Sequence, residues 1–128
     1  MNLLLDTHTL IWWMADSPML SATARAAISN RGNDVWVSSA SAWEITTKYR
    51  IGKLAGVEPI INTLEEEILR ENFRLLDIRF AHGCLAGSLR NDHRDPFDRM
   101  LIAQSLLDNL ALVSNEALFD TFGVTRVW

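Results

Sequence analysis

Short apolar segments that alternate with helical patterns are the feature that most constrains the fold of this chain. Few hairpin turns separate these segments, and helical periodicity fills most of the intervals between them. Strands that alternate with helices form a mainly parallel sheet that is covered on both faces and has right-handed crossovers. We therefore predict an α/β fold. The predicted strands span residues 2–5, 35–38, 74–78, 110–113 and 125–127.

Polar and proline residues mark where the predicted helices begin. Ser21 is a suitable cap, Ser41 and Glu44 have the spacing of a capping box, and Pro96 suits a first helical position. The predicted helices span residues 8–15, 21–30, 41–51, 59–72 and 80–89, with a further helix from Pro96 and a short one from Ser114.

The composition fits one compact domain. The chain has 128 residues, of which 48% are hydrophobic, so we expect a single domain over residues 1–128. Cys84 is the only cysteine and no secretory signal is evident, which favours a cytoplasmic protein. The longest uncharged apolar stretch, residues 7–15, is too short to cross a membrane. The net charge of −4 means that any nucleic acid must meet a local basic patch.

Four acidic residues fall at the predicted ends of strands or one helical turn later: Asp6, Glu44, Asp98 and Glu116. Each has a simpler structural explanation in the capping of a helix. Asp6 is placed to cap the first helix, Glu44 to complete the box with Ser41, and Asp95 and Asp98 to occupy the first turn at Pro96.

Their predicted convergence favours a functional interpretation. The carboxyl ends of parallel strands meet at one edge of a sheet, where ligands bind in open α/β folds. Several carboxylates gathered there would repel one another and so raise one another's pKa values, and a divalent cation offsets this repulsion. Oxygen ligands without His or Cys suit Mg²⁺ or Mn²⁺, and a water bound to such an ion can hydrolyse a phosphodiester.

Other α/β classes with acidic sites fit this sequence less well. A phosphotransferase of the haloacid dehalogenase type places a second Asp two residues after the first, where this chain has His8. A receiver domain needs an adjacent acid pair after the first strand and a later phosphorylatable Asp. A dinucleotide-binding domain needs a glycine-rich turn, which does not follow Leu5.

Nearly the whole chain resembles the PIN-domain family and, within it, the VapC-like toxins. The stretches that carry the resemblance match the family in order and spacing, and their combination is more specific than any one alone. They are NLLLDTHTLIW, SSASAWEITTKYRIGKL, HRDPFDRMLIAQSLL and LVSNEALFDTFGVTRVW.

The resemblance implies a role for each acidic residue. Asp6, Glu44 and Asp98 would be the first, second and third acids of the metal site, and Thr7 would lie close to it. Asp95 recurs in the DPFDR pattern, but helix capping also explains it. The chain departs from the family at the fourth acid, because the family usually carries Asp where this chain has Glu116.

The resemblance also implies a fold, an activity and partners. The expected fold is a three-layer α/β/α sandwich, and the expected activity is endoribonuclease cleavage of RNA that depends on Mg²⁺ or Mn²⁺. We also expect a homodimer that is the toxin of a toxin–antitoxin pair, silenced by a cognate antitoxin. The alternative is a catalytically silent PIN-fold module that binds a partner protein, and the departure at Glu116 leaves room for it.

Basic, histidine and tryptophan residues admit two interpretations each. Lys48 and Arg50 would bind RNA phosphates or form a solvated helical face. Arg99 is expected to pair with a carboxylate, and the metal chemistry does not require His93. The tryptophans Trp12, Trp13 and Trp43 are expected to pack in the core or to form a dimer or antitoxin surface.

Overall fold

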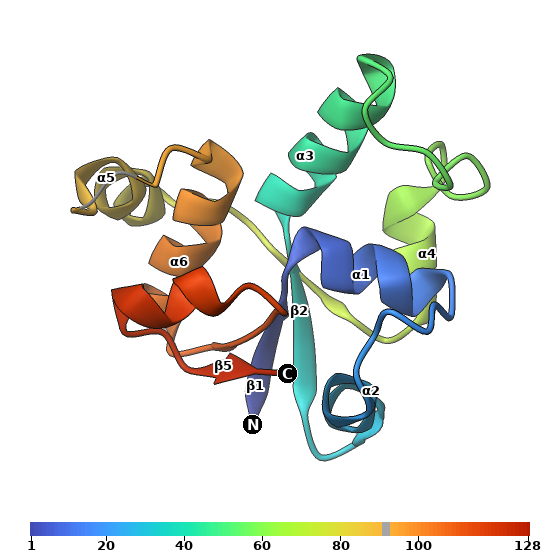
Figure 1. Cartoon of the computed structure of the whole chain (residues 1–128), viewed down its shortest axis with the longest axis horizontal. Helices are drawn as coiled ribbons and strands as arrows, with labels where there is room; N and C mark the ends of the chain where they lie inside the picture. The colour runs from blue at the N-terminus through green and yellow to red at the C-terminus, as the bar shows by residue number, and fades with distance from the viewer. Residues whose placement is uncertain (91–92) are drawn as a thin grey trace.

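The computed structural model describes residues 1–90 and 93–128 and contains one parallel sheet with helices on both sides (Figure 1). Its strands are β1 (Asn2–Leu5), β2 (Asp34–Ser38), β3 (Arg74–Leu76), β4 (Ala111–Val113) and β5 (Arg126–Val127). They lie in the order β3-β2-β1-β4-β5, and every pairing is parallel. The α/β class and the parallel sheet are confirmed.

The helices form two layers that enclose the sheet, as the PIN-like sandwich predicts. Figure 1 shows α5 and α6 on one side and α1, α2 and α4 on the other, while α3 continues from the end of β2. Within the described ranges, no helix is long and apolar enough to cross a membrane. The helices are α1 (Thr7–Met14), α2 (Ala22–Ser29), α3 (Ser39–Arg50), α4 (Leu64–Arg70), α5 (Phe80–Ser88), α6 (Pro96–Asp108) and the 3₁₀-helix η1 (Ala117–Phe122).

Alternate residues of β1 bury themselves in two separate cores. Leu3 and Leu5 pack with residues of α1, α2 and α4, whereas Leu4 packs with Leu101 and Ile102 of α6. Successive side chains of a strand point to opposite faces, so a strand covered on both faces must be apolar throughout. The uninterrupted leucines of β1 therefore fix it as a central strand and bring Asp6 to the carboxyl edge of the sheet.

The capping box predicted at Ser41 and Glu44 is wrong. Helix α3 begins at Ser39, and the side chain of Ser38 accepts a hydrogen bond from the N–H of Ala40 at 3.0 Å. Strand β2 leads into α3 without a loop, so Ser38 becomes the cap. Ser41 and Glu44 consequently lie inside the helix, and their side chains are free for other contacts.

The helix predicted over residues 59–72 is shorter than its apolar pattern. Only Leu64–Arg70 is α-helical, and the N–H groups of Ile60 and Ile61 instead bond to the carbonyl of Val57 in turns. Both isoleucines pack against the core from these turns. The apolar pattern therefore indicated which residues are buried, but these residues do not form a continuous helix. The helix expected from Ser114 is η1, which begins only at Ala117.

Candidate active site

Asp6 lies at the junction of β1 and α1, and its side chain does not cap the helix. It occupies the N-cap position without a side-chain capping bond, and it is only 4% exposed. Its Oδ2 accepts a hydrogen bond from the hydroxyl of Ser114, at the end of β4, at 2.7 Å. The neighbouring strands thus orient a buried carboxylate at the edge of the sheet, and the structural alternative, in which Asp6 caps α1, is wrong.

Glu44 contributes a second buried carboxylate from α3. Its side chain is almost inaccessible and its Oε2 forms an ion pair with Lys48, one helical turn further along. In the described part of the chain, Glu44 Oε1 is buried without a hydrogen-bond partner. An unpartnered buried carboxylate oxygen is costly, and a cation near it would remove that cost.

Asp98 brings the third carboxylate from the first turn of α6. Its Oδ2 lies 2.9 Å from Nε2 of His93, and its side chain is 20% exposed. The expectation that Asp98 follows a strand is wrong, because α5 and a loop precede α6. Helix α6 nevertheless leads to the start of β4, so it runs opposite to the strands and its first turn lies at their carboxyl edge.

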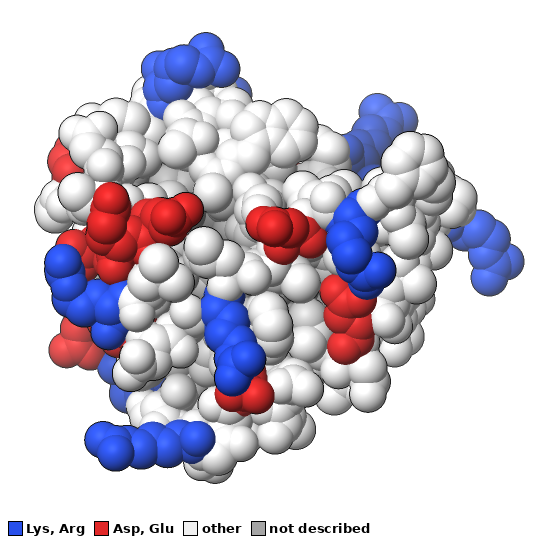
Figure 2. All heavy atoms as spheres, turned by 180° about the vertical axis from the view of Figure 1, so that it is seen from behind, with Lys and Arg blue, Asp and Glu red and all other residues white. Residues whose placement is uncertain are grey.

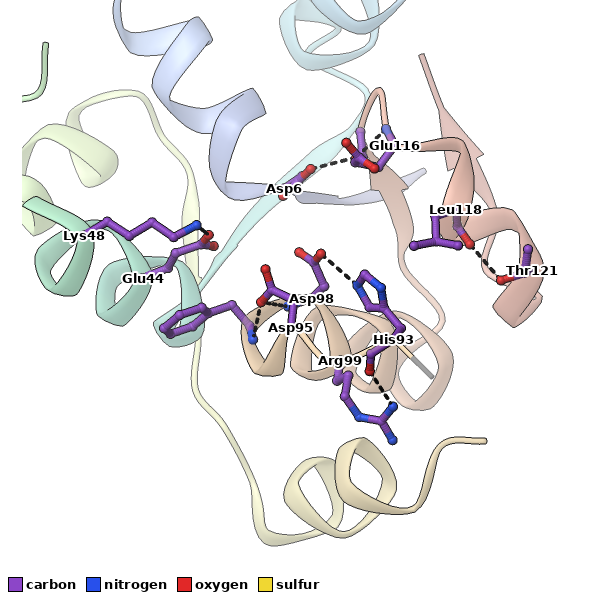
Figure 3. Close-up of polar contacts among 12 residues, drawn as sticks. Asp6, Glu44, Lys48, His93, Asp95, Asp98, Arg99, Glu116, Leu118 and Thr121 are labelled. Carbon is purple, nitrogen blue, oxygen red and sulfur yellow. Dashed lines mark hydrogen bonds and ion pairs between the residues drawn. The ribbon is translucent and has the colours of Figure 1, made fainter. Parts of the chain in front are cut away.

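The carboxylates of Asp6 and Asp98 are turned toward each other in Figure 3, and Glu44 lies to one side on α3 with Lys48. Burial raises the pKa of Asp6, and the charge of Glu44 raises it further. Burial also raises the pKa of Asp98 to about 7, and the charges of Asp95 and Asp6 contribute. These acids therefore share one electrostatic environment in which an added positive charge is favourable.

The donor set fits a hard divalent cation that retains water. Within residues 1–90 and 93–128, no three His, Cys, Asp or Glu side chains are close enough to hold an ion by themselves. Mg²⁺ commonly binds through one or two carboxylates and keeps several waters, so it does not need such a cage. The raised pKa values of Asp6 and Asp98, together with the unpartnered Oε1 of Glu44, are consistent with this kind of site.

The sequence model that describes the PIN domain matches residues 3–123 of this chain. The chain belongs to the PIN domain family. The resemblance predicted from the four sequence stretches is thereby confirmed.

Named relatives of this PIN domain include two proteins of Mycobacterium tuberculosis. Ribonuclease VapC16 is 36% identical over 69 residues, which cover 51% of this chain and 49% of the relative. The match thus spans about half the length of that relative. Ribonuclease VapC22 is 26% identical over 116 residues, which cover 90% of this chain and 87% of the relative.

Solved structures share the fold of the PIN domain. The DNA-bound VapBC from Salmonella typhimurium has a TM-score of 0.72 at 21% identity, and the match covers 98% of this chain and 96% of that chain. VapBC2 from Rickettsia felis, bound to a promoter DNA fragment, has a TM-score of 0.66 at 16% identity and covers 98% and 97%. The named relatives confirm the predicted likeness to VapC proteins, and the solved structures show the same fold.

The other predicted residues of the PIN domain site fall into two groups. Asp95 caps α6, because its Oδ1 accepts from the N–H groups of Phe97 and Asp98, and Lys48 forms the ion pair with Glu44. Thr7 is buried and donates to Ser41 Oγ at 3.0 Å.

By contrast, Arg50 is exposed at the far end of α3 and forms none of the site contacts described above. Glu116 is exposed too, and its main-chain N–H donates to Ser114 Oγ. Figure 3 shows it on the β4 side of Asp6.

Sequence reasoning missed one residue that orients an acid, set a second aside as not required, and misassigned a third. Ser114 holds Asp6 and His93 contacts Asp98, and the position of Ser114 directly after a buried strand was an available signal. The prediction that Arg99 pairs with a carboxylate is wrong. Its guanidinium donates to the main-chain carbonyls of Ala86, Leu89 and His93, and so links α6 to the C-terminal end of α5 and to His93.

The face shown in Figure 2 carries no single large basic field. Figure 2 shows Lys and Arg interspersed with Asp and Glu on the face seen from behind. This distribution agrees with the net charge of −4. Local contacts at the site would therefore have to hold a nucleic acid. Lys48, which pairs with Glu44, is a cation placed to make such a contact.

Proposed function

We propose that this PIN domain is an endoribonuclease that hydrolyses RNA phosphodiester bonds with Mg²⁺ or Mn²⁺. The observation that carries the proposal is the meeting of buried Asp6, buried Glu44 and Asp98, from three separate elements, in one electrostatic environment. Burying acids costs stability, so their concentration here is best explained by a positive ligand. When bound, the ion would supply an activated water and stabilise charge that builds on the phosphate.

Asp6, Glu44 and Asp98 would hold the ion partly through the waters that it retains, and their neighbours would orient them. The hydroxyl of Ser114 fixes the carboxylate of Asp6, and the imidazole of His93 does the same for Asp98. Such partners of metal ligands commonly affect metal affinity as well as geometry. Glu116 and Asp95 remain secondary candidates for the metal, because Glu116 is exposed and Asp95 caps α6.

The substrate phosphates would approach past the helix starts at this edge. The N-terminal turns of α1 and α6 carry N–H groups that favour anions, and Thr7 lies in the first of them. Lys48 would bind a phosphate beside Glu44. Arg50, further along α3, would bind the RNA only at a distance from the acids.

The proposed biological role is that of a toxin held inactive by a cognate antitoxin. The relatives named above are VapC ribonucleases, and the solved structures with the same fold are VapBC complexes. We propose the same assembly with an antitoxin for the present chain. We also propose that the chain forms a homodimer and acts in the cytoplasm, where RNA is available. Co-purification of the chain with the protein encoded beside it would test the assembly.

A catalytically silent interaction module is the alternative function. The exposed Glu116, at a position where the resemblance expects Asp, favours it. The buried acids argue against it, because a protein-binding surface gains nothing from the cost of Asp6 and Glu44.

RNA cleavage by the purified chain tests the choice between these functions. We expect cleavage with Mg²⁺ or Mn²⁺ that a chelator abolishes and that Asp98→Asn reduces by at least about a hundredfold. Asp120→Asn is the matched control, because Asp120 is an exposed acid paired with Arg126 in η1 and β5. Folded protein that leaves RNA intact under every metal condition would favour the silent module.

A further inference from the structure

Two aromatic side chains flank the acids of the candidate site. Trp43 directly precedes Glu44 and is 59% exposed, and Phe97 directly precedes Asp98. Their ring centroids are 4.8 Å apart in an edge-on arrangement with an interplanar angle of 72°. The packing of α3 against α6 therefore joins the two aromatics at the rim of the acidic site and leaves much of the Trp43 side chain accessible.

A small apolar hollow lies against this aromatic pair. Its volume is about 200 Å³, smaller than the roughly 300–1,000 Å³ of pockets that take drug-sized ligands, so it suits a single flat ring system. Its walls come from α3, the segment before α5, and the helices α5 and α6. Besides Trp43 and Phe97, the apolar residues that line this aromatic hollow are Ala40, Ile78, Ala86, Gly87, Pro96 and Met100.

The charges around the aromatic hollow suit a nucleotide better than a purely apolar ligand. Lys48 Nζ lies 6.0 Å from the centroid of Phe97 while it also pairs with Glu44, so a cation borders both the aromatic pair and the acids. Arg99 also lines the hollow, but its guanidinium is engaged by main-chain carbonyls. A phosphate beside Lys48 would leave its attached base next to the aromatic pair.

We infer that the aromatic hollow binds one unpaired base of an RNA substrate, stacked on Trp43, next to the phosphate at the acidic site. The inference rests on the proposed function for the position of that phosphate. Bases stack on aromatic side chains with little sequence preference, and only bases of single-stranded segments are free to do so.

A protein side chain is the competing occupant, because exposed tryptophans are common in protein interfaces. The observations favour the base for two reasons. The hollow accommodates about one ring system, and Phe97 in its wall lies 6.0 Å from Nζ of Lys48, which in turn pairs with Glu44. A protein interface would require an extended apolar surface.

Binding of labelled oligoribonucleotides, followed by fluorescence anisotropy, tests the inference. The measurements use Mg²⁺ and the Asp98→Asn background, which prevents cleavage. We expect Trp43→Ala to weaken binding of a single-stranded RNA about tenfold and Trp43→Phe to retain most of the affinity. Phe80→Ala is the matched control, because Phe80 is 90% exposed and lies outside the hollow, and it should leave the affinity unchanged.

Oligonucleotides that lack one base at a time separate stacking from a general loss of folding. At one position, removal of the base should weaken binding as much as Trp43→Ala does, and the two changes together should cost no more than either alone. The inference would be overturned if Trp43→Ala weakened binding equally for every abasic oligonucleotide, or if it did not weaken RNA binding at all. So would unchanged RNA binding accompanied by weaker self-association, which would assign Trp43 to a protein interface.

Failure of the base site is distinguishable from failure of the nuclease proposal. The protein without substitutions is assayed separately for cleavage of the same single-stranded RNA. Cleavage with normal binding by the Trp43→Ala variant would refute only the base site. Binding that depends on Trp43 without any cleavage would refute only the nuclease assignment.

Discussion

Replacement of Asp98 by Asn should stabilise the metal-free protein at pH values above neutrality. Burial and neighbouring charges raise the pKa of Asp98 from 3.8 to about 7. The folded protein therefore holds this proton more tightly than the unfolded chain does. Stability attributable to Asp98 is accordingly present at low pH, falls as the pH rises between about 4 and 7, and stays low above that range.

The size of the effect follows from the same pKa. Each tenfold change in an acid dissociation constant corresponds to about 1.4 kcal/mol, so the limit for Asp98 at about pH 8 is roughly 4 kcal/mol. The Asp98 side chain is 20% exposed, so the solvent screens part of the free-energy cost of its charge. Asparagine also loses the favourable interaction of a carboxylate with the start of α6, about 0.3–1 kcal/mol. We expect a net gain of about 1–3 kcal/mol.

Urea unfolding with a chelator at several pH values between about 5 and 8 measures this difference. The free energy of unfolding of the parent chain should fall with pH more steeply than that of Asp98→Asn. Asp120→Asn is the control, because Arg126 lowers the pKa of the exposed Asp120 and its charge does not change in this range. Parallel pH profiles for the parent chain and Asp98→Asn would refute the electrostatic argument.

Further predictions concern the residues around the acids. Removal of the hydroxyl that orients Asp6, in Ser114→Ala, should weaken Mg²⁺ binding by about 10–100-fold in calorimetry, and unchanged affinity would contradict that role. Lys48→Met leaves the buried Glu44 without its ion pair, so the free energy of unfolding should fall by about 3 kcal/mol. Thermal unfolding with a chelator should then occur at a lower temperature than in the parent chain, and an equal or higher temperature would contradict this prediction. Arg99→Met should speed hydrogen exchange at the C-terminal end of α5, where Leu89 donates to Leu85, and retained protection there would show that the carbonyl contacts of Arg99 are dispensable.

Local sequence patterns determined the layout of the sheet and the position of one acid. The apolar runs at β1 and β4 indicate central strands because both of their faces must be buried, and the order of strands and helices then makes the sheet parallel. Asp6 follows β1 directly, so its place at the carboxyl edge follows from the end of the strand alone. Pro96 likewise placed the first turn of α6 correctly.

The surroundings of the acids depended on the tertiary structure. The spacing of Ser41 and Glu44 indicated a cap, but the direct passage from β2 into α3 gives that role to Ser38 and leaves Glu44 buried beside Lys48. Ser114 reaches Asp6 across 108 residues only because β4 pairs with β1. Helical and strand periodicities record which side of an element is buried. Hydrogen-bond partners and pKa values depend on which distant elements pack together, and no local pattern contains that information.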